Sequence, residues 1–268
     1  MKILFIGDIV GRVGRRIVKE KVQYYVDKYD IDFVIANGEN ASHGKGLTKH
    51  NYEELIDAGV DVITLGNHYK GKSEIYSYIG NVDNLLKPIN ILEKFPGDGS
   101  AVYDVDGISV RVTNVLGSAF INENVSSPYL SILETMEDEE QALIHIVDFH
   151  AEATGEKKSL GFALDGKVSA VLGTHTHVQT KDYQILPNGT AYISDVGMCG
   201  FADGVLGFTK ESVVNRNIFG GVGRFEPPTE GRALFSAVVM DFDEQTGKCK
   251  EIFPIYYVEE LNNERKDY

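Results

Sequence analysis

Residues 1–40, MKILFIGDIVGRVGRRIVKEKVQYYVDKYDIDFVIANGEN, decide the fold because they hold a strand, a helix and a second strand in succession. Residues 3–6 form an apolar run with the length of a buried strand. Apolar side chains then recur at helical spacing at Val22, Tyr25, Val26 and Tyr29, and residues 33–36 form a second run. This order predicts two parallel strands joined by a helix.

The alternation of strand and helix continues beyond residue 40. Thr48 is expected to cap a short helix that carries Tyr52, Leu55 and Ile56 on one face. Residues 62–65 form a third apolar run, and Ser73 is expected to cap the helix that follows it. Strands and helices that alternate through short connections predict a parallel sheet with helices on both faces.

The rest of the chain favours a mixed arrangement. Residues 100–105 and 108–115 have the pattern of a hairpin that turns at Asp106 and Gly107, and residues 183–186 and 190–193 flank a second turn. Further strands are expected at residues 143–149, 168–172, 233–242 and 249–257, with a helical stretch from about Glu156. The sequence therefore predicts an α/β fold with two mixed sheets flanked by helices. We expect one domain, 1–268, because no linker divides the chain.

Composition limits the classes of partner. The 26 basic and 40 acidic side chains give a net charge of −14, which argues against extended nucleic-acid binding but not against a small phosphorylated nucleotide substrate. The two cysteines, Cys199 and Cys249, form no metal or redox motif and are expected to be reduced thiols of a cytoplasmic protein. No stretch approaches the roughly 20 apolar residues of a membrane span, so no membrane partner is expected. The sequence leaves the formation of homo-oligomers open.

Side chains able to bind metal follow five of the predicted strands within three residues. Because the carboxyl ends of strands in such sheets converge, residues far apart in sequence can form one cluster there. The side chains in question are Asp8, Glu39, Asn40, Asn67, His68, His150, His175 and His177.

Each of these residues taken alone has a plainer interpretation. An Asp or Asn after a strand is more often a turn former or a helix cap, and a lone histidine such as His150 is usually structural. His175 and His177, two residues apart just after a strand, are more specific. Five coincidences at one edge of the fold together predict a metal site.

The types of donor side chain indicate which metals are suitable. Apart from His68, which cannot easily join its neighbour Asn67 on a metal, the set has two carboxylates, two amides and three imidazoles. Without a thiolate, these donors suit manganese, iron or zinc. Seven ligands exceed what one such ion normally accepts, so two ions that share a bridging carboxylate are expected. A pair of ions roughly 3.5–4 Å apart is the arrangement that hydrolyses phosphate esters.

The motifs GDIVG (7–11), NGEN (37–40), GNH (66–68), DFHAE (148–152), GTHTH (173–177) and DVGM (195–198) together resemble the calcineurin-like metallophosphoesterases. The similarity is greatest to the YmdB-like branch and covers nearly the whole chain. It implies a layered α-β-β-α fold and a bacterial, dinuclear metal-dependent hydrolase. It also implies a phosphodiesterase that acts on cyclic nucleotides, notably those with a 2′,3′-cyclic phosphate, with iron or manganese favoured and zinc a third candidate.

The chain departs from the broader superfamily at three positions. Val10 stands where the superfamily has a histidine, and Asn40 can supply the missing ligand, as in the YmdB-like branch. Glu39 takes the place of the usual bridging aspartate. Tyr69 replaces an acidic residue that often follows Asn-His, which leaves the orientation of His68 unspecified.

Carried over position by position, the resemblance implies a set of ligands for each ion. One ion would be held by Asp8, Glu39, Asn40 and His177, and the other by Glu39, Asn67, His150 and His175. His68 would be the catalytic residue that protonates the departing ribose oxygen after a metal-bridging hydroxide attacks phosphorus.

Further assignments are weaker. Arg12, Ser42, His43 and Lys45 lie in loops after the strands and are candidate substrate contacts, although exposed polar residues are more often solvated. Residues 219–223 are a candidate lid over the substrate, and His145 is expected to be a packing residue. Two alternatives stay open: a phosphomonoesterase or nucleotidase on the same site, and a metal-stabilised regulatory protein with incidental turnover.

Overall fold

The protein is described by a computed structural model that covers residues 1–138 and 141–260. The longer strands are β1 (Lys2–Ile6), β3 (Phe33–Asn37), β6 (Ser100–Val105), β7 (Ile108–Leu116), β8 (Ile144–His150), β9 (Ala170–Thr174), β13 (Ala233–Phe242) and β14 (Cys249–Val258). The shorter strands are β2 (Asp8–Ile9), β4 (Val62–Thr64), β5 (Leu85–Leu86), β10 (Gln184–Ile185), β11 (Ala191–Ile193) and β12 (Met198–Phe201). The α-helices are α1 (Gly11–Tyr29), α2 (Lys49–Asp57), α3 (Pro128–Asp138), α4 (Thr154–Ala163) and α5 (Lys210–Asn217).

The strands form two mixed sheets, as the sequence predicts. The first has eight strands in the order β2-β12-β13-β1-β3-β4-β5, with β14 added beside β13. Strands β1, β3 and β4 are parallel, whereas β13 pairs antiparallel with β1 along its whole length, from Lys2 opposite Asp241 to Ile6 opposite Ala237. The second sheet has six strands in the order β10-β11-β9-β8-β7-β6, and its central strands β7, β8 and β9 are parallel.

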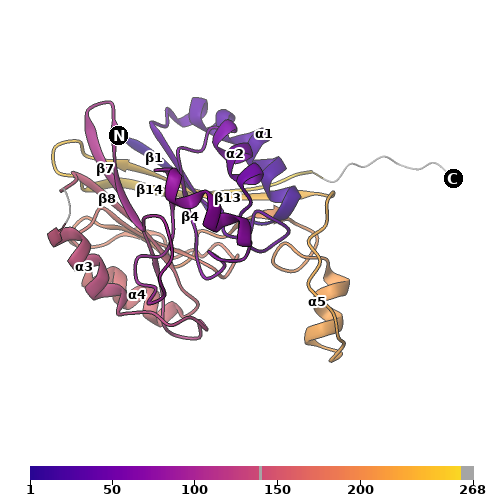
Figure 1. Cartoon of the computed structure of the whole chain (residues 1–268). Coiled ribbons are helices and arrows are strands. Elements are labelled where there is room, and N and C mark those ends of the chain that lie inside the picture. The colour runs from indigo at the N-terminus through magenta and orange to yellow at the C-terminus, as the bar shows by residue number, and fades with distance from the viewer. Residues whose placement is uncertain (139–140, 261–268) are drawn as a thin grey trace.

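Three apolar clusters show that the elements lie in four layers. Helices α1 and α2 pack on the outer face of the first sheet, and helices α3 and α4 pack on the outer face of the second. A third cluster fills the space between the sheets. Figure 1 shows α1 and α2 on one side of the sheets and α3 and α4 on the other. The fold is therefore the layered α-β-β-α arrangement.

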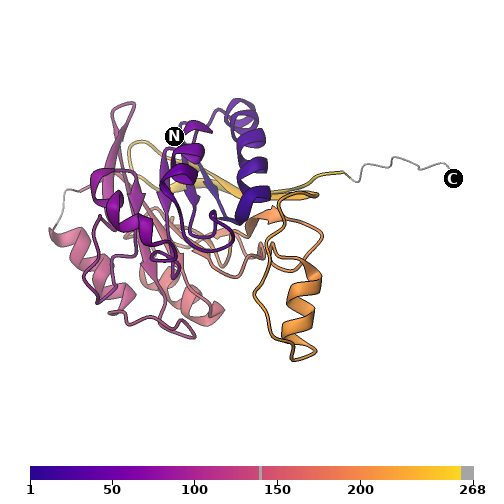
Figure 2. The same ribbon diagram turned by 45° about the vertical axis from the view of Figure 1, so that its right-hand side comes forward.

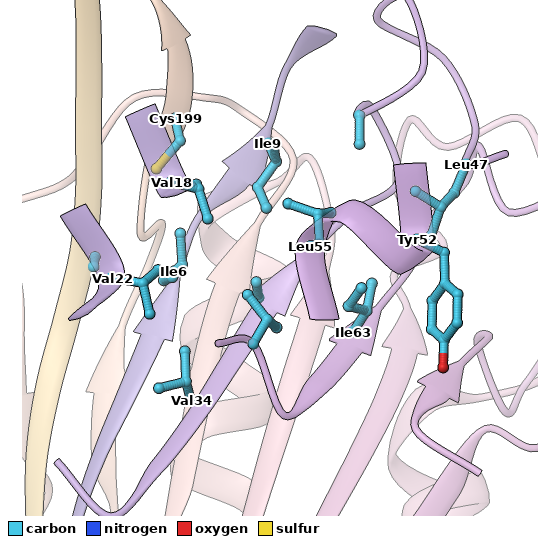
Figure 3. Packing of buried hydrophobic residues seen from close by; sticks show 14 of the residues in the cluster. Ile6, Ile9, Val18, Val22, Val34, Leu47, Tyr52, Leu55, Ile63 and Cys199 are labelled. Carbon is cyan, nitrogen blue, oxygen red and sulfur yellow. The ribbon is translucent and has the colours of Figure 1, made fainter. Parts of the chain in front are cut away.

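The alternation of side chains along each strand explains why these layers form. In β1, Ile3 and Phe5 face the second sheet, while Leu4 and Ile6 face α1. Figure 3 shows part of the outer layer, where Ile6 of β1 lies near Val18 and Val22 of α1. Because every β1 side chain from Ile3 onward is fully buried, the strand reads as a continuous apolar run.

Some of the expected helices differ from those observed. Thr48 does cap α2, because its side chain accepts a hydrogen bond from the backbone N–H of Asn51. The prediction that Ser73 caps a helix is wrong: Ser73 is the first residue of a short 3₁₀ helix (Ser73–Ser77) whose N-cap is Lys72, and no side chain caps it. Helix α5 stands away from the sheets in both Figure 1 and Figure 2. Within the described residues, no helix is long and apolar enough to cross a membrane.

Candidate active site

The carboxyl ends of β1, β3, β4, β8 and β9 meet at one edge of the two sheets. The loops and strand ends there bring together all seven predicted metal ligands and His68, although the residues span positions 8 to 177 in the chain. The edge is shared by both sheets because β1, β3 and β4 belong to the first and β8 and β9 to the second.

One group of donor atoms surrounds His150. Its Nε2 atom lies 3.0 Å from Asn67 Oδ1, 3.2 Å from Glu39 Oε1 and 3.0 Å from His175 Nδ1. Glu39, His150 and His175 each offer a ligand atom within 4.8 Å of the others. On the far side of the His175 ring, Nε2 lies 3.1 Å from Glu152 Oε2, so Glu152 holds Nδ1 of that ring toward the cluster.

A second group of donor atoms surrounds His177. Its Nε2 atom lies 3.1 Å from Asn40 Nδ2 and 3.8 Å from Asp8 Oδ1. Asp8 Oδ2 accepts a hydrogen bond from the backbone N–H of His175, but the buried Oδ1 atom has no hydrogen-bond partner among the described residues. A buried carboxylate oxygen without a partner is costly unless a cation or another ligand satisfies it.

Glu39 lies between the two groups. Its Oε1 atom accepts a hydrogen bond from Asn40 Nδ2 at 3.1 Å and lies 3.2 Å from His150 Nε2, while Oε2 accepts one from the backbone N–H of His68 at 2.7 Å. The converging carboxylate, amide and imidazole atoms, together with the unpartnered oxygen of Asp8, fit bound metal cations.

Burial and mutual charge shift the pKa values of these side chains strongly. Burial raises the pKa of Asp8 to about 6, against the opposing effect of the nearby histidines. Burial also acts to raise the pKa of Glu39, but His150 outweighs it and the pKa is lowered. The reverse holds for His150, where burial is outweighed by Glu39 and the pKa rises to about 9. Burial, reinforced by His150, lowers the pKa of His175 to about 3. Protein groups alone thus pair Glu39 with His150 but leave the charge of Asp8 poorly compensated.

The charge of Asp8 leads to a prediction about stability in the presence of a chelator. The folded-state pKa of about 6 exceeds the value of 3.8 expected for the unfolded chain. The folded state therefore binds more protons between these values, and the free energy of unfolding should fall by about 2–3 kcal/mol as pH rises from 4 to 7. Asp8→Asn cannot titrate and should lack this decrease. Urea unfolding of both proteins at pH 4.5 and pH 7.5 measures the difference, and an equal pH dependence in the two would contradict the assignment.

A buried hydrogen-bond chain fixes the ring of His150. The Nδ1 atom of His150 lies 2.9 Å from Thr174 Oγ1, which donates to Asp148 Oδ1 at 2.7 Å. Asp148 Oδ2 accepts hydrogen bonds from Thr64 Oγ1 at 2.5 Å and Asn37 Nδ2 at 3.0 Å. These contacts direct Nε2 of His150 toward the cluster, the usual role of groups behind a metal-binding histidine. Of the residues in this hydrogen-bond chain, the sequence pattern pointed only to Asp148, which lies two residues before His150 on β8.

The loop that carries the paired histidines is held in an unusual backbone conformation. His175 and His177 have backbone φ angles of 104° and 64°, which residues other than glycine rarely adopt. Asp195 Oδ2 accepts hydrogen bonds from the backbone N–H of Thr176 at 2.9 Å and from the buried Lys157 Nζ at 2.8 Å. This buried ion pair offsets the backbone strain and points both imidazoles into the site. The sequence did not reveal it because Lys157 and Asp195 lie far from each other along the chain.

Gly66 allows the loop after β4 to approach the cluster. A Cβ atom at this position would collide with the carboxylate of Glu39 and with the imidazole of His150. The glycine before Asn67 is therefore required by the close packing of these side chains rather than by its own φ angle.

His68 is oriented by Asn40. The Nδ1 atom of His68 lies 2.8 Å from Asn40 Oδ1, and burial lowers the pKa of the imidazole. Tyr69 turns away from the site, where it is buried and donates a hydrogen bond to Glu93. Asn40, rather than the residue that follows His68, therefore contacts the imidazole.

The four candidate substrate contacts have different surroundings. Ser42 is fully buried, and its Oγ atom accepts hydrogen bonds from the backbone N–H of Thr48 and from Asn51 Nδ2, so it has no surface to offer a substrate. Arg12 is exposed in the first turn of α1. His43 and Lys45 are exposed and line a cavity beside His68. His145 lies outside the site, where its Nε2 atom is 2.8 Å from Thr113 Oγ1, as expected of a packing residue.

A cavity of about 440 Å³ lies in front of the cluster. Its floor includes Glu39, His68 and His175, and its walls come from the segment around α5, including Phe208 and Phe225. The expected lid at residues 219–223 is not part of this lining, because the wall residues lie at 205–217 and at 225.

Comparisons with known proteins show which family and which solved structures the chain is similar to. The sequence model of one family, described as YmdB-like protein, matches residues 4–255. A 2′,3′-cyclic-nucleotide 2′-phosphodiesterase of Bacillus subtilis (strain 168) is 47% identical over 253 residues, which are 94% of this chain and 95% of the relative. The crystal structure of a phosphatase from Mycoplasma pneumoniae superposes with a TM-score of 0.91 at 36% identity and covers 96% of this chain and 93% of its own. An NAD nucleotidase of Haemophilus influenzae shares the fold, with a TM-score of 0.60 at 10% identity over 96% of this chain and 56% of its own.

Proposed function

The chain belongs to the YmdB-like family, and from this premise we propose that it is a metal-dependent phosphodiesterase that hydrolyses nucleoside 2′,3′-cyclic phosphates. The observation that carries the proposal is the position of Glu39, whose carboxylate lies between two groups of donor atoms and beside His68. The activity of the Bacillus subtilis relative, a 2′,3′-cyclic-nucleotide 2′-phosphodiesterase, supports the choice of substrate.

We propose that the site holds two ions. Asp8, Glu39, Asn40 and His177 would bind one, and Glu39, Asn67, His150 and His175 the other. The donor set, which contains no thiolate, suits iron, manganese or zinc, and iron or manganese is proposed ahead of zinc on the family resemblance alone. The bound ions would withdraw charge from the phosphoryl oxygens and lower the pKa of water at the site.

His68 would supply the proton that the leaving oxygen needs. When the bond between phosphorus and a ribose oxygen breaks, the oxygen leaves as an alkoxide unless it is protonated, and hydroxide adds to phosphorus. His68 lines the cavity and is held by Asn40 through its Nδ1 atom, which leaves Nε2 as the atom available to the substrate. Asn40 would bind a cation through its amide oxygen if its amide group turned over from the orientation in which Oδ1 faces His68. Its N–H group would then face His68 and fix the proton on Nε2.

A second candidate is a phosphomonoesterase or nucleotidase reaction at the same residues. The similarity to a Mycoplasma pneumoniae phosphatase supports this second candidate. Both reactions would use the donor cluster and differ in the leaving group that His68 serves. A regulatory protein with incidental turnover is less well supported, since binding alone would not require an oriented proton donor beside the cluster.

A panel of substrates tests the proposed function. We expect adenosine 2′,3′-cyclic phosphate to be hydrolysed with a kcat/KM at least about 10-fold above that of adenosine 3′,5′-cyclic phosphate or p-nitrophenyl phosphate. Elemental analysis of the same preparation should give close to two transition-metal ions per chain. Cleavage of the monoester alone would replace the proposal by the second candidate, and one ion or none would remove its dinuclear site.

We also propose a bacterial origin and a cytoplasmic location. The family similarity supports the first. Two free and buried cysteines support the second, because reduced thiols are typical of that compartment.

A further inference from the structure

A second cavity, of about 950 Å³, opens beside His68. We call it the basic pocket and define it by Lys45, Lys72, Phe208, Arg216, Arg224 and Phe225. These side chains come from the loops after β3 and β4 and from the segment around α5, which stands off the sheets in Figures 1 and 2. Its volume is in the range of cavities that bind small molecules.

The pocket gathers positive charge in a strongly acidic chain. Its lining contains four cations and one carboxylate, Glu226, whereas the whole chain carries a net charge of −14. Within residues 1–138 and 141–260, no ion pair involves any of these four cations. By contrast Lys210, on the same helix as Arg216, is paired with Glu211 at 3.6 Å. Four cations around one cavity repel one another, and an anion would relieve this repulsion.

Aromatic rings stand beside the cations. The rings of Phe208 and Phe225 are 5.6 Å apart, and the Arg216 guanidinium lies 4.9 Å from the centre of the Phe225 ring. Aromatic faces and guanidinium groups are the surfaces on which proteins stack nucleobases. The lining therefore offers contacts for a base as well as for an anion.

The basic pocket is continuous with the active-site cavity. His68, Gly44, Phe208 and Phe225 line both. If His68 protonates a ribose oxygen, the ribose lies beside His68 when the cyclic phosphate lies over the donor cluster. The base and the 5′ carbon of that ribose are then next to the basic pocket. A nucleoside 2′,3′-cyclic phosphate carries a single negative charge at the reacting phosphorus, so it gives the four cations no partner.

We propose that the basic pocket binds a second phosphate, attached to the 5′ oxygen of the nucleoside whose cyclic phosphate is hydrolysed. This inference rests on the proposed function and deepens it. The second phosphate has two sources: a 5′-phosphomonoester of a single nucleotide, or the phosphodiester that precedes the last nucleoside of an RNA strand ending in a 2′,3′-cyclic phosphate. Because the pocket adjoins one nucleoside only, extended binding of nucleic acid is not required.

The test compares three substrates that share the reacting group. These are adenosine 2′,3′-cyclic phosphate, its 5′-phosphorylated form, and the dinucleotide ApA with a terminal 2′,3′-cyclic phosphate. We expect the 5′-phosphorylated compound to have a kcat/KM about 10-fold or more above that of the first, mainly through a lower KM, since charge-assisted hydrogen bonds to phosphate are strong. A similar gain with the dinucleotide would assign the natural source to RNA ends, whereas a gain with the monoester alone would assign it to single nucleotides.

Charge-removing variants locate the effect. In Lys72→Gln/Arg224→Gln, the ratio of kcat/KM between the 5′-phosphorylated and unphosphorylated compounds should fall to about one. The ratio is used because it cancels any loss common to both substrates. Lys210→Gln removes a cation from α5 outside the pocket and should keep the full ratio. Calorimetric titration of adenosine 3′,5′-bisphosphate and adenosine 3′-phosphate should show the same preference and its loss in the double variant.

The possible outcomes distinguish failure of the second-phosphate site from failure of the proposed phosphodiesterase function. Hydrolysis of all three compounds with equal kcat/KM would overturn the second-phosphate site but leave the proposed function intact. No hydrolysis of any cyclic phosphate by the metal-loaded protein would remove the proposed function instead. A preference that survives in the double variant would place the second phosphate elsewhere on the protein and overturn the basic pocket as its site.

Discussion

Glu39→Gln is expected to lose bound metal and to lower kcat/KM for a nucleoside 2′,3′-cyclic phosphate by about 10³-fold or more. Glutamine has the size of glutamate and can still accept the backbone N–H of His68, so the fold should persist. It cannot supply the negative charge that lies between the two groups of donor atoms. Elemental analysis and steady-state kinetics on the same preparation measure both effects.

Two matched substitutions make this result specific. Glu152→Gln alters a carboxylate that lies 3.1 Å from Nε2 on the outer side of the His175 ring and lines the active-site cavity, and we expect a loss of about 10–100-fold. Glu53→Gln removes a carboxylate on α2 that pairs with Lys49, and it should change neither metal content nor kcat/KM. Full metal content together with full activity in Glu39→Gln would exclude Glu39 as the shared ligand.

His68→Gln is expected to keep both metals and to lower kcat by about 10²–10⁴-fold, the range for loss of a general acid. The effect should depend on the leaving group. Hydrolysis of bis-p-nitrophenyl phosphate releases a stable phenolate that needs no proton, so that reaction should lose far less activity. His50→Gln, on the exposed surface of α2, is the matched control and should behave as the wild type. An equal loss on both substrates would show that His68 acts in some way other than proton donation.

The sequence predicted the cluster of donor side chains because its information is local. Each of Asp8, Glu39, Asn67, His150 and His175 follows an apolar run, and the rule that parallel strands end at one edge brings them together. The two hairpins were predicted correctly for the same reason, because residues typical of turns lie between their strands in the sequence. The layered α-β-β-α fold follows from the family resemblance and from the alternation of apolar runs.

The supporting contacts could not be predicted because they join residues that no local pattern connects. The chain from His150 through Thr174 to Asp148 crosses from β8 to β9 and back, and the pair of Lys157 with Asp195 joins α4 to a loop after β11. Helix α5 escaped detection because only Val213 in it is buried, which leaves little periodicity. Because the sequence did not predict α5, it predicted neither the walls of the active-site cavity nor the part of the basic pocket that comes from the segment around α5.

The antiparallel pairing of β1 with β13 has a consequence for how the protein is made. All seven donor side chains have been synthesised once residue 177 is added, but the antiparallel neighbour of β1 in the first sheet lies at residues 233–242. The backbone N–H of Gly7, one residue before Asp8, also donates to Ser236 of that late strand. A growing chain on the ribosome therefore carries every candidate ligand before it has the antiparallel neighbour of β1, and such distant pairings form slowly. A transcript that ends soon after His177 would yield a polypeptide with the full set of ligands but with β1 lacking its antiparallel partner.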